Sequence, residues 1–274
     1  MFLARDAPVG VVLRRGPSNW ARLTLWHTDT DEFEPGQWLS GRVFERRSDL
    51  SADGSLFAYF VRKDTAKAMR EVGADSWIAV SRPPWFTALA LWAIGGTYCT
   101  GPCFPERGTI FLGGTEDAPD RGTLPRWLVP VKTPRFADHT TDWTDRTVYF
   151  SRLLRDGWTP VPDVQAALPW WEHRSPDGRS ALIMMPRSDD NFTAYGGRHV
   201  TEYALRDETT GEVHELGRAT WADWDHGGRL IVAQGGGLWH RRAPEALVQI
   251  ANFNAERPKP ELSPARALEW PPPP

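Results

Sequence analysis

The sequence predicts an all-β fold built from repeated four-stranded units, and three observations support this prediction. First, a Ser-Pro-Asp-Gly turn at residues 175–178 joins a polar extended arm to an apolar arm. This is a hairpin signature, because Pro presets φ and Gly accepts a positive φ. Second, related turns recur at residues 51–54, 105–108 and 225–228. Third, the 274-residue chain holds 15 Trp and is 41% hydrophobic, which is enough apolar volume for a large core.

The spacing of these turns indicates the size of the repeat. Their final glycines, Gly54, Gly108, Gly178 and Gly228, are 54, 70 and 50 residues apart by subtraction. Steps of this size are typical of units made of four short strands, and the longest step contains an insertion. The sequence therefore predicts a five-bladed β-propeller of four-stranded antiparallel blades.

The elements follow in chain order. A short strand over residues 9–15 is followed by a hairpin over 21–39, and residues 42–61 form a second hairpin around the 51–54 turn. Residues 147–153 and 158–161 are expected to pair as a hairpin further along, and only residues 63–71 have helical composition. The predicted blades are 9–39 completed by 260–269, then 42–92, 95–160, 168–216 and 218–251.

The two ends of the chain are predicted to close the ring. This division gives five outer hairpins and four inner ones, so one inner arm is missing from the N-terminal blade. Residues 261–268 are similar to residues 175–182, apart from the lost Asp-Gly of the turn. A C-terminal strand beside residues 9–15 would leave no open sheet edge. We therefore expect a single domain over residues 1–269, followed by a Pro-rich disordered tail, 270–274.

The turn motifs resemble those of the WD40-like β-propeller family of the PD40 or TolB type. In that family a Ser-Pro-Asp-Gly-(Arg/Lys)-x-(Leu/Ile) turn joins the two inner strands of a blade. The pattern is complete at residues 175–179, nearly complete at 51–54, and degraded at the other copies. The regular Gly-His and Trp-Asp dipeptides of strict WD40 repeats are absent. The resemblance implies a propeller but implies no function, because this fold hosts enzymes, scaffolds and lectins.

Composition favours a cytoplasmic chain without nucleic-acid or membrane partners. The net charge is -3, no Lys/Arg run exceeds a pair, and the apolar opening of three residues is too short for a secretory signal. No window has the apolar length of a membrane span. Cys99 and Cys103 are four residues apart, outside the redox CxxC spacing, and are expected to be reduced and structural. Residues 27–34 lack the spacing of a calcium loop, so neither a metal nor a cofactor is expected.

Inner strands of a propeller line its central channel, and alternate side chains on a strand share a face. Counting back five and seven residues from each turn glycine gives eight positions, of which Cys103 and Gly101 are two and the other six are the candidate ligand-binding side chains. They form a mixed acidic, aromatic, basic and imidazole set: Arg47, Asp49, Trp171, His173, Trp221 and Asp223. The alternative is that these side chains are simply solvated by trapped water.

The predicted function is a non-catalytic cytoplasmic interaction module that binds a protein partner through its loop face or channel mouth. The enlarged connection over residues 113–145 would be part of that face, because long insertions in compact repeats are usually functional. One alternative is a Trp-rich lectin that binds carbohydrate. The other is a propeller glycosidase using Asp49, Glu172 and Asp223, although regular alternation points Glu172 away from His173.

Overall fold

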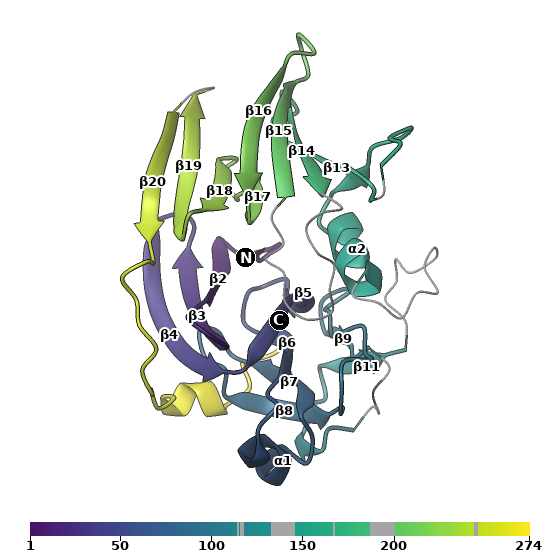
Figure 1. Ribbon diagram of the computed structural model, residues 1–274. Helices are drawn as coiled ribbons and strands as arrows, with labels where there is room; N and C mark the ends of the chain where they lie inside the picture. The colour runs from purple at the N-terminus through teal and green to yellow at the C-terminus, as the bar shows by residue number, and fades with distance from the viewer. Residues whose placement is uncertain (114, 116–117, 133–145, 167, 187–200, 244–245) are drawn as a thin grey trace. The chain divides into compact units, whose positions relative to one another are not determined.

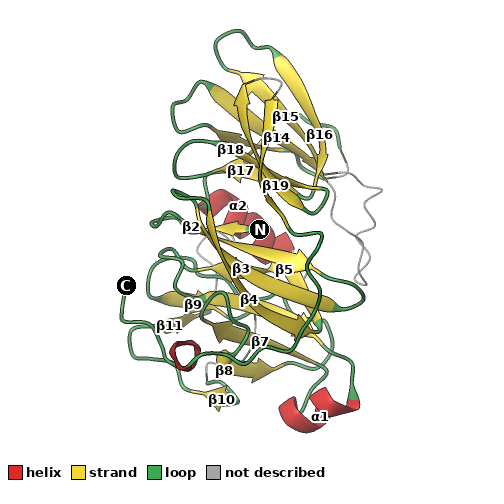
Figure 2. Ribbon diagram, turned by 90° about the vertical axis from the view of Figure 1, so that its left-hand side faces the viewer, coloured by secondary structure: helices red, strands yellow, loops and turns green. Residues whose placement is uncertain are grey.

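The computed structural model describes residues 1–274 except 114, 116–117, 133–145, 167, 187–200 and 244–245. The chain divides into two compact units: unit 1 is Met1–Arg155 with Arg257–Pro274, and unit 2 is Asp156–Glu256. Strands predominate in both units, as Figure 2 shows. Among the described residues, four antiparallel sheets and one parallel strand pair form. The fold is all-β and propeller-like, since each antiparallel sheet has four or five strands that pair with their neighbours in sequence, except that β10 pairs with β8.

The first sheet of unit 1 forms from the N-terminal 40 residues (Figure 1). Its strands lie in sequence order: β1 (Phe2–Leu3), β2 (Val9–Arg15), β3 (Trp20–His27) and β4 (Glu32–Ser40). Strand β2 pairs with β1 at Phe2↔Val11 and with β3 at Val9↔His27. Both edges of β2 are therefore occupied by strands from the N-terminal segment itself.

The predicted ring closure by the C-terminal segment is therefore wrong. Residues 260–269 form no strand, and a 3-10 helix spans Ala265–Leu268 instead. The predicted disordered tail also lies against unit 1, where Trp270 packs edge-on against Trp127 at 6.3 Å and Pro271 is buried. A segment without the turn's Asp-Gly lacks the residues that would reverse the chain into a hairpin.

The second sheet of unit 1 has the order β10-β8-β7-β6-β5. Its strands are β5 (Arg42–Leu50), β6 (Phe57–Arg62), β7 (Ser76–Ser81), β8 (Ala88–Ala93) and β10 (Arg121–Gly122). Helix α1 (Ala66–Val72) connects β6 to β7 and overlaps the region predicted to be helical, 63–71, and the Thr65 side chain caps its first turn. The short strands β9 (Thr109–Phe111) and β11 (Val129–Val131) pair in parallel. Apolar side chains from these elements fill two core clusters.

The blade predicted over residues 95–160 does not form among the described residues, and five blades are not confirmed. Residues 147–153, expected to be a strand, lie in helix α2 (Arg146–Arg155). The run has the β-branched and aromatic residues of a strand, but tertiary contacts override that propensity. Arg152 and Arg155, three residues apart, share one helix face and both reach Asp49.

Unit 2 contains two antiparallel sheets with uninterrupted sequence order. The first comprises β12 (Thr159–Pro160), β13 (Trp171–Arg174), β14 (Ser180–Pro186), β15 (Thr201–Asp207) and β16 (Val213–Ala219). The second comprises β17 (Trp221–Trp224), β18 (Leu230–Gln234), β19 (Gly237–Ala243) and β20 (Ala246–Asn252). The hairpins predicted around the 175–178 and 225–228 turns are the pairs β13/β14 and β17/β18.

The two best turn motifs have the same hydrogen bonds. The Ser51 hydroxyl donates to Asp53 Oδ1 at 2.6 Å and accepts from Leu56 N at 2.9 Å. In the other unit Ser175 donates to Asp177 at 2.6 Å, and its hydroxyl accepts from the backbone N of residue 180 at 3.0 Å. The closing glycines have φ of 75° and 69°. The repeated sequence thus marks a repeated hairpin turn, which confirms that part of the prediction.

Candidate functional site

Two of the predicted site residues form a direct pair in unit 2. His173 lies on β13 and Asp223 on β17, each five residues before the glycine of its turn. The imidazole Nδ1 lies 2.7 Å from Asp223 Oδ1. Because an ionised carboxylate can only accept, Nδ1 carries the hydrogen and donates it. The pair therefore links the two sheets of unit 2 through equivalent positions of successive hairpins.

Asp223 is held in place by two further donors. The Trp158 indole Nε1 donates to Asp223 Oδ2 at 3.2 Å, and the Trp224 backbone N donates to Oδ1 at 2.8 Å. The Trp224 indole in turn donates to the His173 carbonyl oxygen at 3.0 Å. Both members of the pair are thus fixed by neighbouring tryptophans, which is the arrangement that keeps an acid–base group oriented.

The second nitrogen of His173 faces a glycine. The Trp158 ring lies beside the imidazole with centroids 5.2 Å apart, and a Cβ built on Gly157 would lie 3.0 Å from His173 Nε2. Gly157 also has a φ of 89°, which favours glycine. The side chains of His173 and Asp223 are 22% and 16% exposed, so the pair is shielded but reached by solvent.

The environment raises the pKa of His173 above its ordinary value of 6.5. Burial disfavours the charged imidazole, but the hydrogen bond and the charge of Asp223 outweigh it, with a further contribution from the charge of Asp156. With Nδ1 committed to Asp223, proton exchange falls to Nε2. This arrangement can donate or accept a proton near neutral pH, which is the chemistry of a general acid–base group.

The aromatic members of the predicted set have different surroundings. Trp171 is buried, with 4% of its surface exposed, and lies opposite Met184 in the β13/β14 ladder. Trp221 is partly buried at the start of β17. Sequence reasoning missed Gly157 and Trp158, which complete the site. The sequence analysis assigned these two residues to an outer hairpin over residues 147–161, as its turn and the start of its return arm, and so placed them outside the site.

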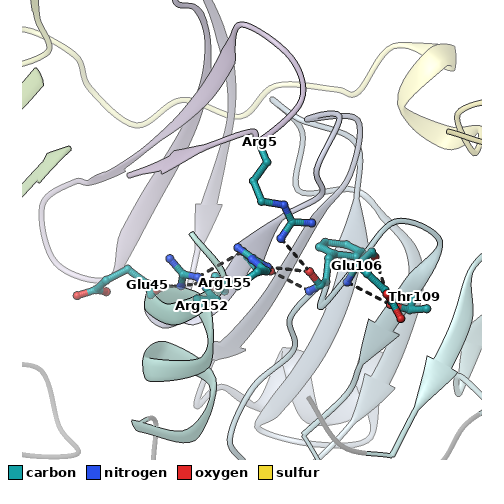
Figure 3. A network of polar contacts seen from close by, with 9 residues as sticks. Arg5, Glu45, Glu106, Thr109, Arg152 and Arg155 are labelled. Carbon is teal, nitrogen blue, oxygen red and sulfur yellow. Dashed lines mark hydrogen bonds and ion pairs between the residues drawn. The ribbon is translucent and has the colours of Figure 1, made fainter. Parts of the chain in front are cut away.

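Asp49 and Arg47 lie in unit 1. Asp49 is the centre of a buried ion network, and its partners Arg152 and Arg155 are labelled in Figure 3. Its side chain is 2% exposed and accepts from Arg155 Nη2 at 3.0 Å and from Phe104 N at 2.8 Å. Arg152 Nε lies 3.3 Å away. Burial opposes ionisation, but the charge and hydrogen bond of Arg155 hold the pKa of Asp49 below its ordinary value. We therefore assign Asp49 a structural role and do not include it in the candidate site.

Arg47 lies on the same strand, β5, as Asp49 and takes no part in that network. Its Nη1 donates to the Thr97 carbonyl oxygen at 2.8 Å, and its guanidinium lies over the rings of Phe44 and Phe60 at 5.4 and 5.5 Å. Glu172, the third carboxylate of the glycosidase alternative, accepts from Arg206 at 2.8 Å. The three carboxylates of that alternative therefore have three separate sets of partners.

Comparison with family models and with curated proteins assigns no family to the chain. No family model matches the sequence, and no curated protein matches it. Among solved structures, the chain is similar to one from Bacteroides fragilis described as a "putative 6-phosphogluconolactonase". The identity is 11%, the match covers 88% of this chain and 93% of that chain, and the TM-score is 0.43. These values are too low to transfer an activity, a substrate or a site residue.

The prediction of a non-catalytic interaction module is corrected, because the contact between His173 and Asp223 has the arrangement of a general acid–base pair. That module is not proposed again, and the glycosidase alternative is set aside because Asp49, Glu172 and Asp223 have three separate sets of partners. The predicted partner-binding connection over 113–145 lies largely outside the described residues. Within the described part of the chain, no group of His, Cys, Asp and Glu is placed to hold a metal ion. In the same residues no helix has the length and apolarity to cross a membrane.

Cys99 and Cys103 are both buried, and no disulfide joins them. Burial raises the pKa of the Cys99 thiol to about 11, so this thiol is not a nucleophile at neutral pH.

Proposed function

We propose that the chain is a small-molecule hydrolase in which His173 is the general acid–base residue and Asp223 positions it. The observation that carries the proposal is the 2.7 Å contact between His173 Nδ1 and Asp223 Oδ1. Asp223 fixes the tautomer, so that His173 Nε2 is the atom that takes a proton from water and returns it to the leaving group.

The experiment compares turnover of the full chain with that of three variants. Aryl carboxylic and phosphoric esters are the substrates, because each class releases a chromophore on hydrolysis. His173→Gln should lower kcat at least about 100-fold, the usual contribution of a general acid–base group. Asp223→Asn should lower kcat as well, because it permits the wrong tautomer and removes the charge that stabilises the imidazolium.

The matched control is His214→Gln. His214 is another imidazole of unit 2, 3.7 Å from the Glu212 carboxylate, and its side chain is 38% exposed. This variant should retain wild-type turnover and the wild-type melting temperature. Equal turnover in His173→Gln and wild type would reject the proposal, and so would a wild type that hydrolyses neither class of ester.

Membership of the PD40-type propeller family is part of this proposal. The shared hydrogen bonding of the 51–54 and 175–178 turns supports it. A cytoplasmic location, a single domain over residues 1–269, a protein or carbohydrate partner, and the absence of nucleic-acid and membrane partners stay predictions.

A further inference from the structure

An arginine cluster in unit 1 lies apart from the proposed acid–base site. It gathers around the Phe44 ring, over which the guanidinium of Arg42 lies at 4.4 Å and that of Arg47 at 5.4 Å. Arg62 faces Arg42 across the β5/β6 ladder. Arg15, at the end of β2, is close enough to act electrostatically on Arg42.

The carboxylates near the cluster are taken by its outer members. Glu45 binds Arg15 at 2.6 Å. Asp64 and Asp75 lie 3.1 and 3.5 Å from Arg62. Within the residues that the structure describes, Arg42 and Arg47 have no ion pair with a carboxylate.

Arg42 and Arg47 also retain buried donors. The Nε of each is buried without a hydrogen-bond partner among the described residues. Arg47 is only 9% exposed, and its one hydrogen bond in that part of the chain goes to a neutral carbonyl. A buried donor without a partner commonly marks the place of an ion or a water. A buried charge is ordinarily paired as well, so the two features together favour an anion over a water molecule.

We propose that Arg42 and Arg47 bind an oxyanion, a phosphate or carboxylate group of a small molecule, with Arg15 and Arg62 at the rim. The guanidinium fork matches both groups, because it donates two parallel hydrogen bonds to a pair of oxygens. Repulsion within the cluster supports the assignment. Burial lowers the pKa of Arg42, and the charges of Arg15, Arg47 and Arg62 lower it further against the opposing effect of Glu45.

Exposure increases from the centre of the cluster to its rim. Arg47 is 9% exposed, and the side chains of Arg62 and Arg15 are 29% and 36% exposed. A small anion can therefore approach from the rim, where Arg42 is partly buried, and reach the buried Arg47. All the residues involved belong to unit 1, so the proposal stands or falls independently of His173.

The test uses the full chain, with inorganic phosphate and succinate as separate probes. Each probe is titrated calorimetrically at constant ionic strength, with sodium chloride as the balancing salt. We expect saturable binding of at least one probe and a melting temperature that rises with its concentration, because a ligand that binds only the folded state stabilises it. The tighter probe identifies the group. If neither binds above the chloride background, the proposal is overturned.

Substitution of Arg42 distinguishes a role in anion binding from a role in packing. Arg42→Gln should weaken the affinity about tenfold or more, as expected for losing charge-assisted hydrogen bonds. It should also raise the melting temperature in the absence of probe, because one repelled cation is gone. A packing role predicts the reverse pair of results: a lower melting temperature and unchanged affinity. That outcome would overturn the proposal.

Two further variants complete the design. Arg47→Lys keeps the cation and most of the stem but loses the fork, so the affinity should fall while the fold persists. Arg107→Gln is the control, since Arg107 is an exposed arginine of unit 1 paired with Asp6 at 2.7 Å. It should bind the probe as the wild type does. An equal loss of affinity in Arg107→Gln would show unspecific attraction and refute a defined site.

Discussion

Asp49→Ala should destabilise unit 1 strongly. Asp49 is 2% exposed, and the side chains of its partners Arg155 and Arg152 are 7% and 12% exposed. Removing the carboxylate takes the Asp49 charge away from two buried guanidinium groups, and breaking a buried pair in this way costs about 3–5 kcal/mol. For a protein of this size, each kcal/mol corresponds to roughly 2–4 °C, so the melting temperature should fall by about 6–20 °C.

Thermal and urea unfolding followed by tryptophan fluorescence would measure this loss. The control is Asp6→Ala, which breaks the exposed ion pair with Arg107 in the same unit and should cost no more than about 1 kcal/mol. The double variant Asp49→Leu/Arg155→Leu should recover part of the loss, because it removes both charges together. An Asp49→Ala loss no larger than that of Asp6→Ala would refute the reasoning.

The same carboxylate predicts a pH dependence. The fold lowers the pKa of Asp49, because Arg155 outweighs the cost of burial. The unfolded chain therefore binds this proton at a higher pH than the folded chain does. The contribution of Asp49 is fully present above the unfolded value, about 3.9, and is lost as the pH falls through the folded pKa. The stability difference between wild type and Asp49→Asn should accordingly shrink only in acid.

Two other predictions concern the backbone and the imidazole. Gly101→Ala should lower the free energy of unfolding clearly more than Gly95→Ala does. Both glycines have a positive φ, so an alanine at either position is strained by about 1–2 kcal/mol. A Cβ on Gly101 would also lie 2.5 Å from Arg47 Cβ, whereas nothing lies within 4 Å of a Cβ on Gly95. Urea unfolding measures the two losses, and equal values would contradict the crowding argument. Because Asp223 helps to raise the pKa of His173, the stability from this pair should be full below about pH 6.5 and lost as the pH rises through the folded value. An NMR titration of the imidazole should show a pKa above 6.5 in wild type and a lower one in Asp223→Asn, and an unchanged value would contradict the assignment.

Local hairpin chemistry was predictable because it depends on few neighbouring residues. The Ser-x-Asp-Gly sequence contains its own hydrogen-bond donors, acceptors and positive-φ glycine, so the turns at 51–54 and 175–178 form as expected. The same regularity allowed His173 and Asp223 to be selected as site residues from the sequence, since these equivalent positions of successive hairpins are in contact. Counting from the turn glycine located both residues without any knowledge of the sheets.

The segments that sequence reasoning misassigned are those fixed by distant partners. Residues 147–153 have strand-like composition, but a helix allows Arg152 and Arg155 to reach one carboxylate more than 100 residues away in sequence. The C-terminal segment was assigned a strand by similarity to the 175–182 motif. Strand β1 already occupies the edge of β2 that this segment was expected to pair with, and no local pattern reveals that.

The position five residues before the turn glycine carries an acidic or imidazole side chain at Asp49, His173 and Asp223, but its chemistry differs between the units. In unit 1 the Asp49 carboxylate is 2% exposed and is paired with two arginines, so its ionisation contributes to the stability of the fold. In unit 2 the partner is an imidazole, the pair is 16–22% exposed, and the pKa is raised from a value already near neutral. Proton transfer needs a group that solvent can reach and that titrates near working pH. Of these two charged sites, only the His173–Asp223 pair meets both conditions.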